Sequence, residues 1–170
     1  MPKQTSGLSN LKVLVVDDDW SSVDTLVDLL NSRSIEAEGI TDPTKLFGWT
    51  NPERFASFDI IFLDMHLGPS KSGGAISAAD AILHIMTYCP TAKAIVFTHK
   101  DVTVEEFVRC IQLGALGFIP KIYDIDQFVL AANVYRQLGD EKRALEERIR
   151  SLWVMLEEAA NPAKIGRAHV

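Results

Sequence analysis

Five residues that could do chemistry each stand at the end of a short apolar run of the chain. They are Asp17, Asp18, Asp64, Thr98 and Lys121. Carboxylates packed together repel one another and raise each other's pKa unless a cation joins them. Oxygen ligands suit a hard divalent cation such as Mg²⁺. A hydroxyl and a lysine opposite that cation could hold phosphoryl oxygens, so the set predicts phosphoryl transfer onto a carboxylate.

Alternating strands and helices must bring these residues together if they form one site. Apolar β-branched runs predict strands at 11–16, 35–40, 58–63, 92–97 and 116–119. Helical spacing predicts helices from the first aspartates to residue 32, over 75–88, over 102–113 and from about 124 onward. This order predicts an α/β fold with helices on both faces of a parallel sheet. In such sheets the site lies at the carboxyl ends of the strands.

Turn-forming and capping residues divide these elements. Pro52 should interrupt the irregular helical region at 41–57, and the Gly-, Pro- and Ser-rich segment 68–74 predicts a loop. Gly114 is expected to cap the end of the helix before it. Asp19 is predicted to be a helix cap or a solvated residue and not a ligand, because aspartate favours helix starts.

The ordered strand-end motifs resemble the receiver domain of two-component response regulators. The motifs are VVDDD, FLDMHLG, VFTH and GFIPK, and the resemblance covers about residues 11–139. It implies a flavodoxin-like fold with a five-stranded parallel sheet in the order 2-1-3-4-5. It also implies a signalling domain that takes its phosphoryl group from a sensor histidine kinase or a phosphotransfer protein and is not an enzyme in the turnover sense.

The resemblance also implies where the acceptor and the metal would be. Asp64 would be the phosphoacceptor. Asp17 and Asp18 would hold Mg²⁺ together with Asp64, joined by the backbone carbonyl of His66.

The phosphoryl-binding and switch residues follow from the same resemblance. Thr98 would bond a phosphoryl oxygen, and Lys121 would pair with the phosphoryl group or with Asp64. Phe118 matches the aromatic position whose ring turns inward with Thr98 on activation. His99 stands where the family usually has a small residue, so its ring would either slow phosphotransfer or hydrolysis or act on water.

Two further departures lie near these motifs. The loop after Asp64 is expected to be one residue longer than usual, because Gly68 precedes Pro69 and the later glycine is Gly73. Lys121 is preceded by a proline, whereas the family usually has a proline after it.

Other functions must be weighed against this one. The domain could be a pseudo-receiver that is never phosphorylated and acts through dimerisation alone, which Mg²⁺ dependence would reveal. The segment DMHLG at 64–68 is also close to the D-x-H-x-x-G signature of cobalamin-binding domains, although its glycine comes one place early. An absorbance measurement would settle that alternative.

A heptad seam marks the last helix. Its members recur at alternating spacings of three and four, and they are Tyr135, Leu138, Lys142, Leu145, Ile149, Leu152, Leu156 and Ala159. The seam predicts a coiled-coil extension at 140–160 and a homodimer, with a helix folded back on its own domain as the alternative. Gly139 could be a hinge. The final residues 161–170 would be a linker or a cloning-derived tail, and the output domain would be missing from this segment.

Composition narrows the class of protein. The 170 residues carry a net charge of −6, which argues against direct binding of nucleic acid by this segment. No run approaches the length of a membrane span, and the polar tail 1–10 lacks the apolar core of a signal peptide. Two cysteines are too few for a disulfide framework. These features predict a cytoplasmic protein without membrane contact.

Overall fold

The computed structural model describes residues 11–70, 72–99, 102–121 and 124–160 of the chain. The chain divides into two compact units, one up to Arg136 and one from Gln137 onward. The terminal segments 1–10 and 161–170, for which a tail and a linker were predicted, lie outside the described residues.

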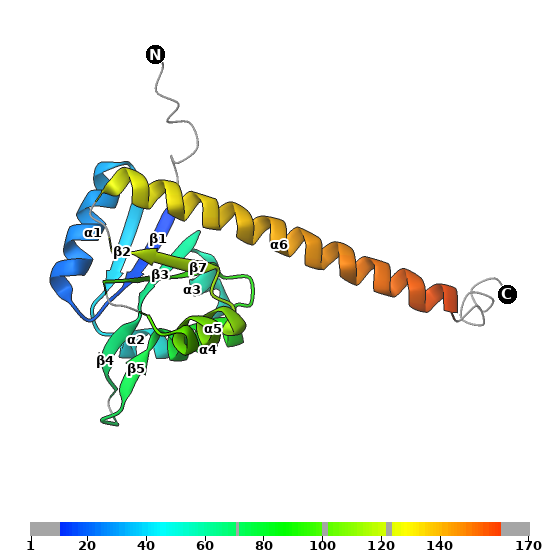
Figure 1. Cartoon of the computed structure of the whole chain (residues 1–170), viewed down its shortest axis with the longest axis horizontal. Coiled ribbons are helices and arrows are strands. Elements are labelled where there is room, and N and C mark those ends of the chain that lie inside the picture. The colour runs from blue at the N-terminus through cyan, green and yellow to red at the C-terminus, as the bar shows by residue number, and fades with distance from the viewer. Residues whose placement is uncertain (1–10, 71, 100–101, 122–123, 161–170) are drawn as a thin grey trace, which may run out of the picture. The chain divides into compact units, whose positions relative to one another are not determined.

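A five-stranded parallel sheet forms the centre of the first unit (Figure 1). Its order is β2-β1-β3-β6-β7, which confirms the predicted order 2-1-3-4-5 when these five strands are counted along the chain. The strands are β1 (Lys12–Val16), β2 (Glu36–Ile40), β3 (Ile60–Asp64), β6 (Ala94–Thr98) and β7 (Gly117–Pro120).

Helices cover both faces of this sheet, so its inner strands are apolar apart from Lys12, Asp64 and Thr98 at their ends. The helices of the chain are α1 (Trp20–Ser32), α2 (Thr44–Phe47), α3 (Pro52–Ala56), α4 (Ala78–Tyr88), α5 (Val104–Leu113) and α6 (Ile125–Ala160). In β1, Val13 and Val15 join the core cluster that contains residues of α1 and of the start of α6. Leu14 and Val16 join the opposite cluster, which contains residues of α2 to α5. Alternate residues of one strand therefore supply both layers of the core.

Three local predictions are confirmed. Asp19 caps α1, because its side chain accepts a hydrogen bond from the Ser21 amide at 3.0 Å. Gly114 caps α5 in the left-handed conformation, with φ of 118°. The region around Pro52 consists of two short helices, α2 and α3.

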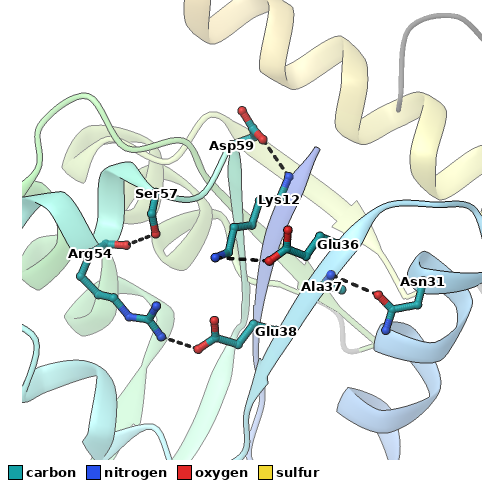
Figure 2. A network of polar contacts seen from close by, with 8 residues as sticks. All are labelled: Lys12, Asn31, Glu36, Ala37, Glu38, Arg54, Ser57 and Asp59. Atoms are coloured by element: carbon teal, nitrogen blue, oxygen red, sulfur yellow. Dashed lines mark hydrogen bonds and ion pairs between the residues drawn. The ribbon is translucent and has the colours of Figure 1, made fainter. Parts of the chain in front are cut away.

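The edge strand β2 carries two glutamates, and each of them forms an ion pair with a cationic side chain (Figure 2). Glu36 forms an ion pair with Lys12 Nζ at 3.3 Å, and Glu38 pairs with Arg54. The Lys12 amide also donates to Asp59 at 2.7 Å. These charges balance one another, and they disfavour the pairing of a further strand with the open edge of the sheet.

The segment after Asp64 differs from the prediction of a loop at 68–74 followed by a helix over 75–88. It forms a hairpin of β4 (His66–Pro69) and β5 (Ala75–Ser77), and α4 begins only at Ala78. Leu67 and Ile76 hold the hairpin in place because both side chains are buried in the core. Ser77 then forms a capping box with Asp80, which fixes the start of α4.

The last helix continues without a break through Gly139 to Ala160. Tyr135, the first residue of the predicted seam, packs in the first unit, where its ring lies beside Gly117 and its hydroxyl donates to the Phe118 carbonyl at 3.1 Å. Within the second unit, every described residue from 141 to 160 is exposed. Among the described residues, no helix is both long and apolar enough to cross a membrane.

Candidate functional site

The carboxyl ends of the parallel strands bring four of the predicted residues to one edge of the sheet. Asp64 ends β3, where it is in register with Phe97 of β6, and Thr98 ends β6, where it is in register with Pro120 of β7. Asp17 and Lys121 directly follow β1 and β7. The topology thus places side chains that are far apart in sequence next to one another.

Lys121 is the cation at the centre of this edge. Its Nζ lies 2.5 Å from Asp17 Oδ2 and 3.3 Å from Asp64 Oδ1. The Lys121 side chain is 7% exposed and that of Asp17 only 1%, so the pair is almost wholly out of water. The Lys121 amide donates to the Thr98 carbonyl at 3.0 Å, which fixes the start of the lysine side chain beside β6.

Three carboxylates share the site with the ammonium group of Lys121. Asp17, Asp18 and Asp64 each offer an oxygen atom, and these atoms lie within 4.8 Å of one another. Among the described residues, Lys121 is the one cation paired with these carboxylates, so this part of the cluster has an excess of negative charge. A divalent cation with oxygen ligands fits this donor set and would remove the excess.

The charges of the site shift the pKa values of two of its groups. Burial raises the pKa of the Asp64 carboxyl, and the neighbouring Asp17 charge raises it further, against the opposing effect of Lys121. Burial alone would lower the pKa of Lys121, but its hydrogen bond and charge attraction to Asp17, with a smaller effect of Asp64, raise it instead. The lysine therefore stays charged, while the Asp64 carboxylate is destabilised until a further cation joins it.

Phe118 connects this edge with the helices beside it. Its ring is half-buried and lies 4.8 Å from the ring of Phe107 on α5, measured between ring centroids. Its carbonyl accepts the hydrogen bond from Tyr135 of α6. Thr98 is 8% exposed at the end of the neighbouring strand. The predicted switch residues therefore lie where a change at the site could reach α5.

The two histidines near the site are both exposed. His66 is the first residue of β4 and is in register with Ser77 of β5, while His99 directly follows β6. Because both side chains are exposed, neither ring is part of the buried Asp17–Lys121 pair.

Gly68 also belongs to this site, and the sequence reasoning assigned it no role. It adopts φ of +82°, and a Cβ atom built on it would lie 2.7 Å from Asp18 Oδ2. The Gly68-Pro69 dipeptide was a visible turn signal, but its contact with Asp18 depends on the hairpin.

Comparisons with solved structures agree with the fold described above. The chain resembles a fusion protein that carries the trimeric coiled coil of yeast Spc42, with a TM-score of 0.66 and 16% identity over 93% of this chain and 99% of that one. NtrX from Brucella abortus matches with a TM-score of 0.64 and 21% identity over 79% of this chain, which is only 29% of NtrX. A CheY-like receiver domain from Methanospirillum hungatei JF-1 matches with a TM-score of 0.60 and 17% identity over 79% of this chain and 99% of that one.

A comparison with curated protein sequences finds no match. The family model of the response regulator receiver domain matches residues 13–133, which include all the strand-end residues described above. The chain therefore belongs to the family of response regulator receiver domains.

Proposed function

We propose that Asp64 accepts a phosphoryl group from a sensor histidine kinase or a phosphotransfer protein. The observation that carries this proposal is the contact of one buried lysine, Lys121, with both Asp17 and Asp64 inside a cluster of three carboxylates. An arrangement with so much uncompensated negative charge costs folding free energy. It is better explained as a site built for a cation and a phosphoryl group than as a structural ion pair.

In the proposed reaction, a carboxylate oxygen of Asp64 forms a bond to phosphorus while the bond from phosphorus to the histidine nitrogen of the donor breaks. The product is an acyl phosphate on Asp64. Lys121 holds the acceptor, and its ammonium group can pair with a phosphoryl oxygen. Asp17, Asp18 and Asp64, with the His66 carbonyl, would hold Mg²⁺, which would neutralise charge on the transferred group.

Thr98 and Phe118 are the residues proposed to change position when Asp64 is phosphorylated. The Thr98 hydroxyl would bond a phosphoryl oxygen, and Phe118 would follow it inward. Since the Phe118 ring contacts Phe107, this movement would alter the surface of α5. His99, exposed directly after Thr98, would modulate the approach of the donor or of water.

The C-terminal helix is the proposed dimerisation element. Its apolar seam residues are strongly exposed in the single chain: Leu138 48%, Leu145 58%, Ile149 46%, Leu152 58% and Leu156 60%. A second copy of the helix would cover them, with Lys142 as the one polar layer. The signal would pass along this helix to an output domain, and the chain would act in the cytoplasm as a signalling module and not as a turnover enzyme.

Phosphorylation is tested by the intact mass of the protein after incubation with acetyl phosphate. We expect one added phosphoryl group that requires Mg²⁺ and is lost in Asp64→Asn. Asp59→Asn is a matched control, because Asp59 precedes the same strand at its other end. No addition to a folded wild-type chain would contradict phosphorylation by small donors and would favour the pseudo-receiver alternative. A visible absorbance band that stays with the protein after free cobalamin is removed would instead favour the cobalamin alternative.

Dimerisation is tested by the mass of the protein in solution. We expect a dimer for the wild type and a monomer for Leu152→Lys, because a charge would enter the middle of the seam. Ser151→Lys adds the same charge one residue away from the seam, and it should remain dimeric. A wild-type monomer, or equal behaviour of the two variants, would contradict the proposed interface.

A further inference from the structure

We propose that Gly68 is a positioning residue, because its lack of a side chain leaves the space in which the Asp18 carboxylate lies in the acidic cluster. This inference rests on the proposed function in one respect, namely that the cluster binds Mg²⁺. It concerns the hairpin that follows the phosphoacceptor, at the position where β4 passes Asp18.

The hairpin has an irregular register at this point. His66 is paired with Ser77 and Pro69 with Ala75, so the chain advances three residues in β4 but two in β5. One extra residue therefore lies in β4, which makes a bulge. Gly68 lies within it and has φ of +82°, a conformation that glycine adopts without strain. Bulges of this kind bend a strand locally and are frequent beside active sites.

The bulge brings the backbone of β4 against Asp18. A Cβ atom on Gly68 would lie 2.7 Å from Asp18 Oδ2 and 3.3 Å from both Cβ and Cγ of Asp18. No rotation of the carboxylate alone relieves contacts with all three atoms. A side chain at position 68 would therefore displace the Asp18 carboxylate oxygen and shift the rest of the Asp18 side chain slightly.

Asp18 is held by fewer polar partners than the other two aspartates, and it is exposed. Lys121 holds Asp17 and Asp64, and the Asp19 amide also donates to Asp17 at 3.0 Å. Among the hydrogen bonds and ion pairs of the described residues, none involves the Asp18 carboxylate. The space beside Gly68, which has no Cβ atom, is therefore what leaves this carboxylate free to lie in the cluster.

The same hairpin offers a matched control in Gly73. It too has a positive φ, of 88°, but a Cβ atom on it would meet nothing within 4 Å. Gly68→Ala and Gly73→Ala therefore introduce similar backbone strain, and only the first introduces a collision with Asp18. The difference between the two variants isolates the effect of that collision.

The experiment is a Mg²⁺ titration of the full chain, followed by the amide chemical shifts of residues 17–19, together with thermal unfolding. We expect Gly68→Ala to bind Mg²⁺ roughly 10- to 100-fold more weakly than Gly73→Ala, the usual effect of losing a residue that orients a metal ligand. The two variants should unfold at similar temperatures. Phosphorylation of Gly68→Ala by acetyl phosphate should recover at high Mg²⁺, which a general structural defect would not allow.

Equal Mg²⁺ affinity in the two variants would overturn the role of Gly68 while leaving the proposed function intact. A wild-type chain that binds no Mg²⁺ would contradict the proposed metal site itself. Should Gly68→Ala fail to fold, Gly68→Asn and Gly73→Asn repeat the comparison, because asparagine tolerates the left-handed conformation better than alanine.

Discussion

The charged side chains are paired differently in two regions of the central sheet. At the amino end and along the edge strand β2, Lys12 pairs with Glu36 and Arg54 with Glu38, one cation to each anion, and these side chains are 32–71% exposed. At the carboxyl end, three carboxylates lie together, and among the described residues Lys121 is the one ammonium group paired with them. The first arrangement is already neutral in water, whereas the second keeps an excess of negative charge among its described residues. The same strands thus carry balanced surface ion pairs in one region and an acidic cluster suited to a divalent cation in the other.

The largest expected effect comes from removing the cation at each end of the sheet in turn. Lys121→Met should lower the free energy of unfolding by roughly 3–5 kcal/mol, because it leaves the buried Asp17 charge unpaired. Lys12→Met, at the start of β1, should cost about 1 kcal/mol or less. Urea denaturation without Mg²⁺ measures both. Similar losses would mean that the two ends do not differ as described.

Mg²⁺ should stabilise the carboxyl end selectively. At ten times its dissociation constant, a bound ion adds about 1.4 kcal/mol to the free energy of unfolding. We expect this gain in the wild type and in Glu38→Gln, but not in Asp17→Asn, which lacks one of the ligands. Thermal unfolding across a series of Mg²⁺ concentrations measures the gain, and an equal gain in all three proteins would point to binding elsewhere.

Without Mg²⁺, Asp64→Asn should make the protein more stable at neutral pH. Folding raises the pKa of Asp64, so the folded chain holds this proton more tightly than the unfolded chain. The contribution of Asp64 is therefore most favourable below the unfolded pKa of about 3.9 and is lost as the pH rises through the folded pKa. Removing the charge should therefore raise Tm, and in a chain of this size each 1 kcal/mol corresponds to about 2–4 °C.

The control for this effect is its dependence on pH. The difference in Tm between Asp64→Asn and the wild type should shrink as the pH falls through the raised pKa of the wild-type carboxyl, because the protonated group carries no charge. A difference that is constant with pH would show that the charge of Asp64 is not its cause.

The smallest effect is expected at the edge strand β2. Glu38→Gln removes the charge that faces Arg54, and since both side chains are 39% exposed it should cost about 0–1 kcal/mol. The loss should vanish in high salt, where exposed charges are screened. A loss that persists in high salt would show that the pair is not simply a solvated surface contact.

The hairpin β4–β5 shows where prediction from the sequence was wrong. The segment from Gly68 to Gly74 is rich in turn-forming residues, so it has the composition of a loop. Its two strands are only four and three residues long, too short for a periodic signal. They are stable because Leu67 and Ile76 are buried against the core, which is a tertiary contact. The Ser77 and Asp80 pair, by contrast, was a readable signal for the start of α4.

Prediction from the sequence was also limited for the ion-pair partner of Lys121. The family resemblance implied a pairing with Asp64 or with a phosphoryl group, but in the structure the lysine lies nearer to Asp17. The sequence placed all three residues at strand ends. It carried no information on which carboxylate, reached from a different strand, would lie closest to the ammonium group.

The sequence by itself determined the α/β class and the residues that meet at the carboxyl edge of the sheet, whereas the order of the strands was implied by the resemblance to receiver domains. It could do so because apolar runs and turn residues are local signals, and because parallel topology brings every strand end to one edge. Only the tertiary structure decided that β4 bulges at Gly68 against Asp18 and that Asp17 is the nearest partner of Lys121. These distances arise from the packing of segments that are remote in sequence, and no local pattern contains them.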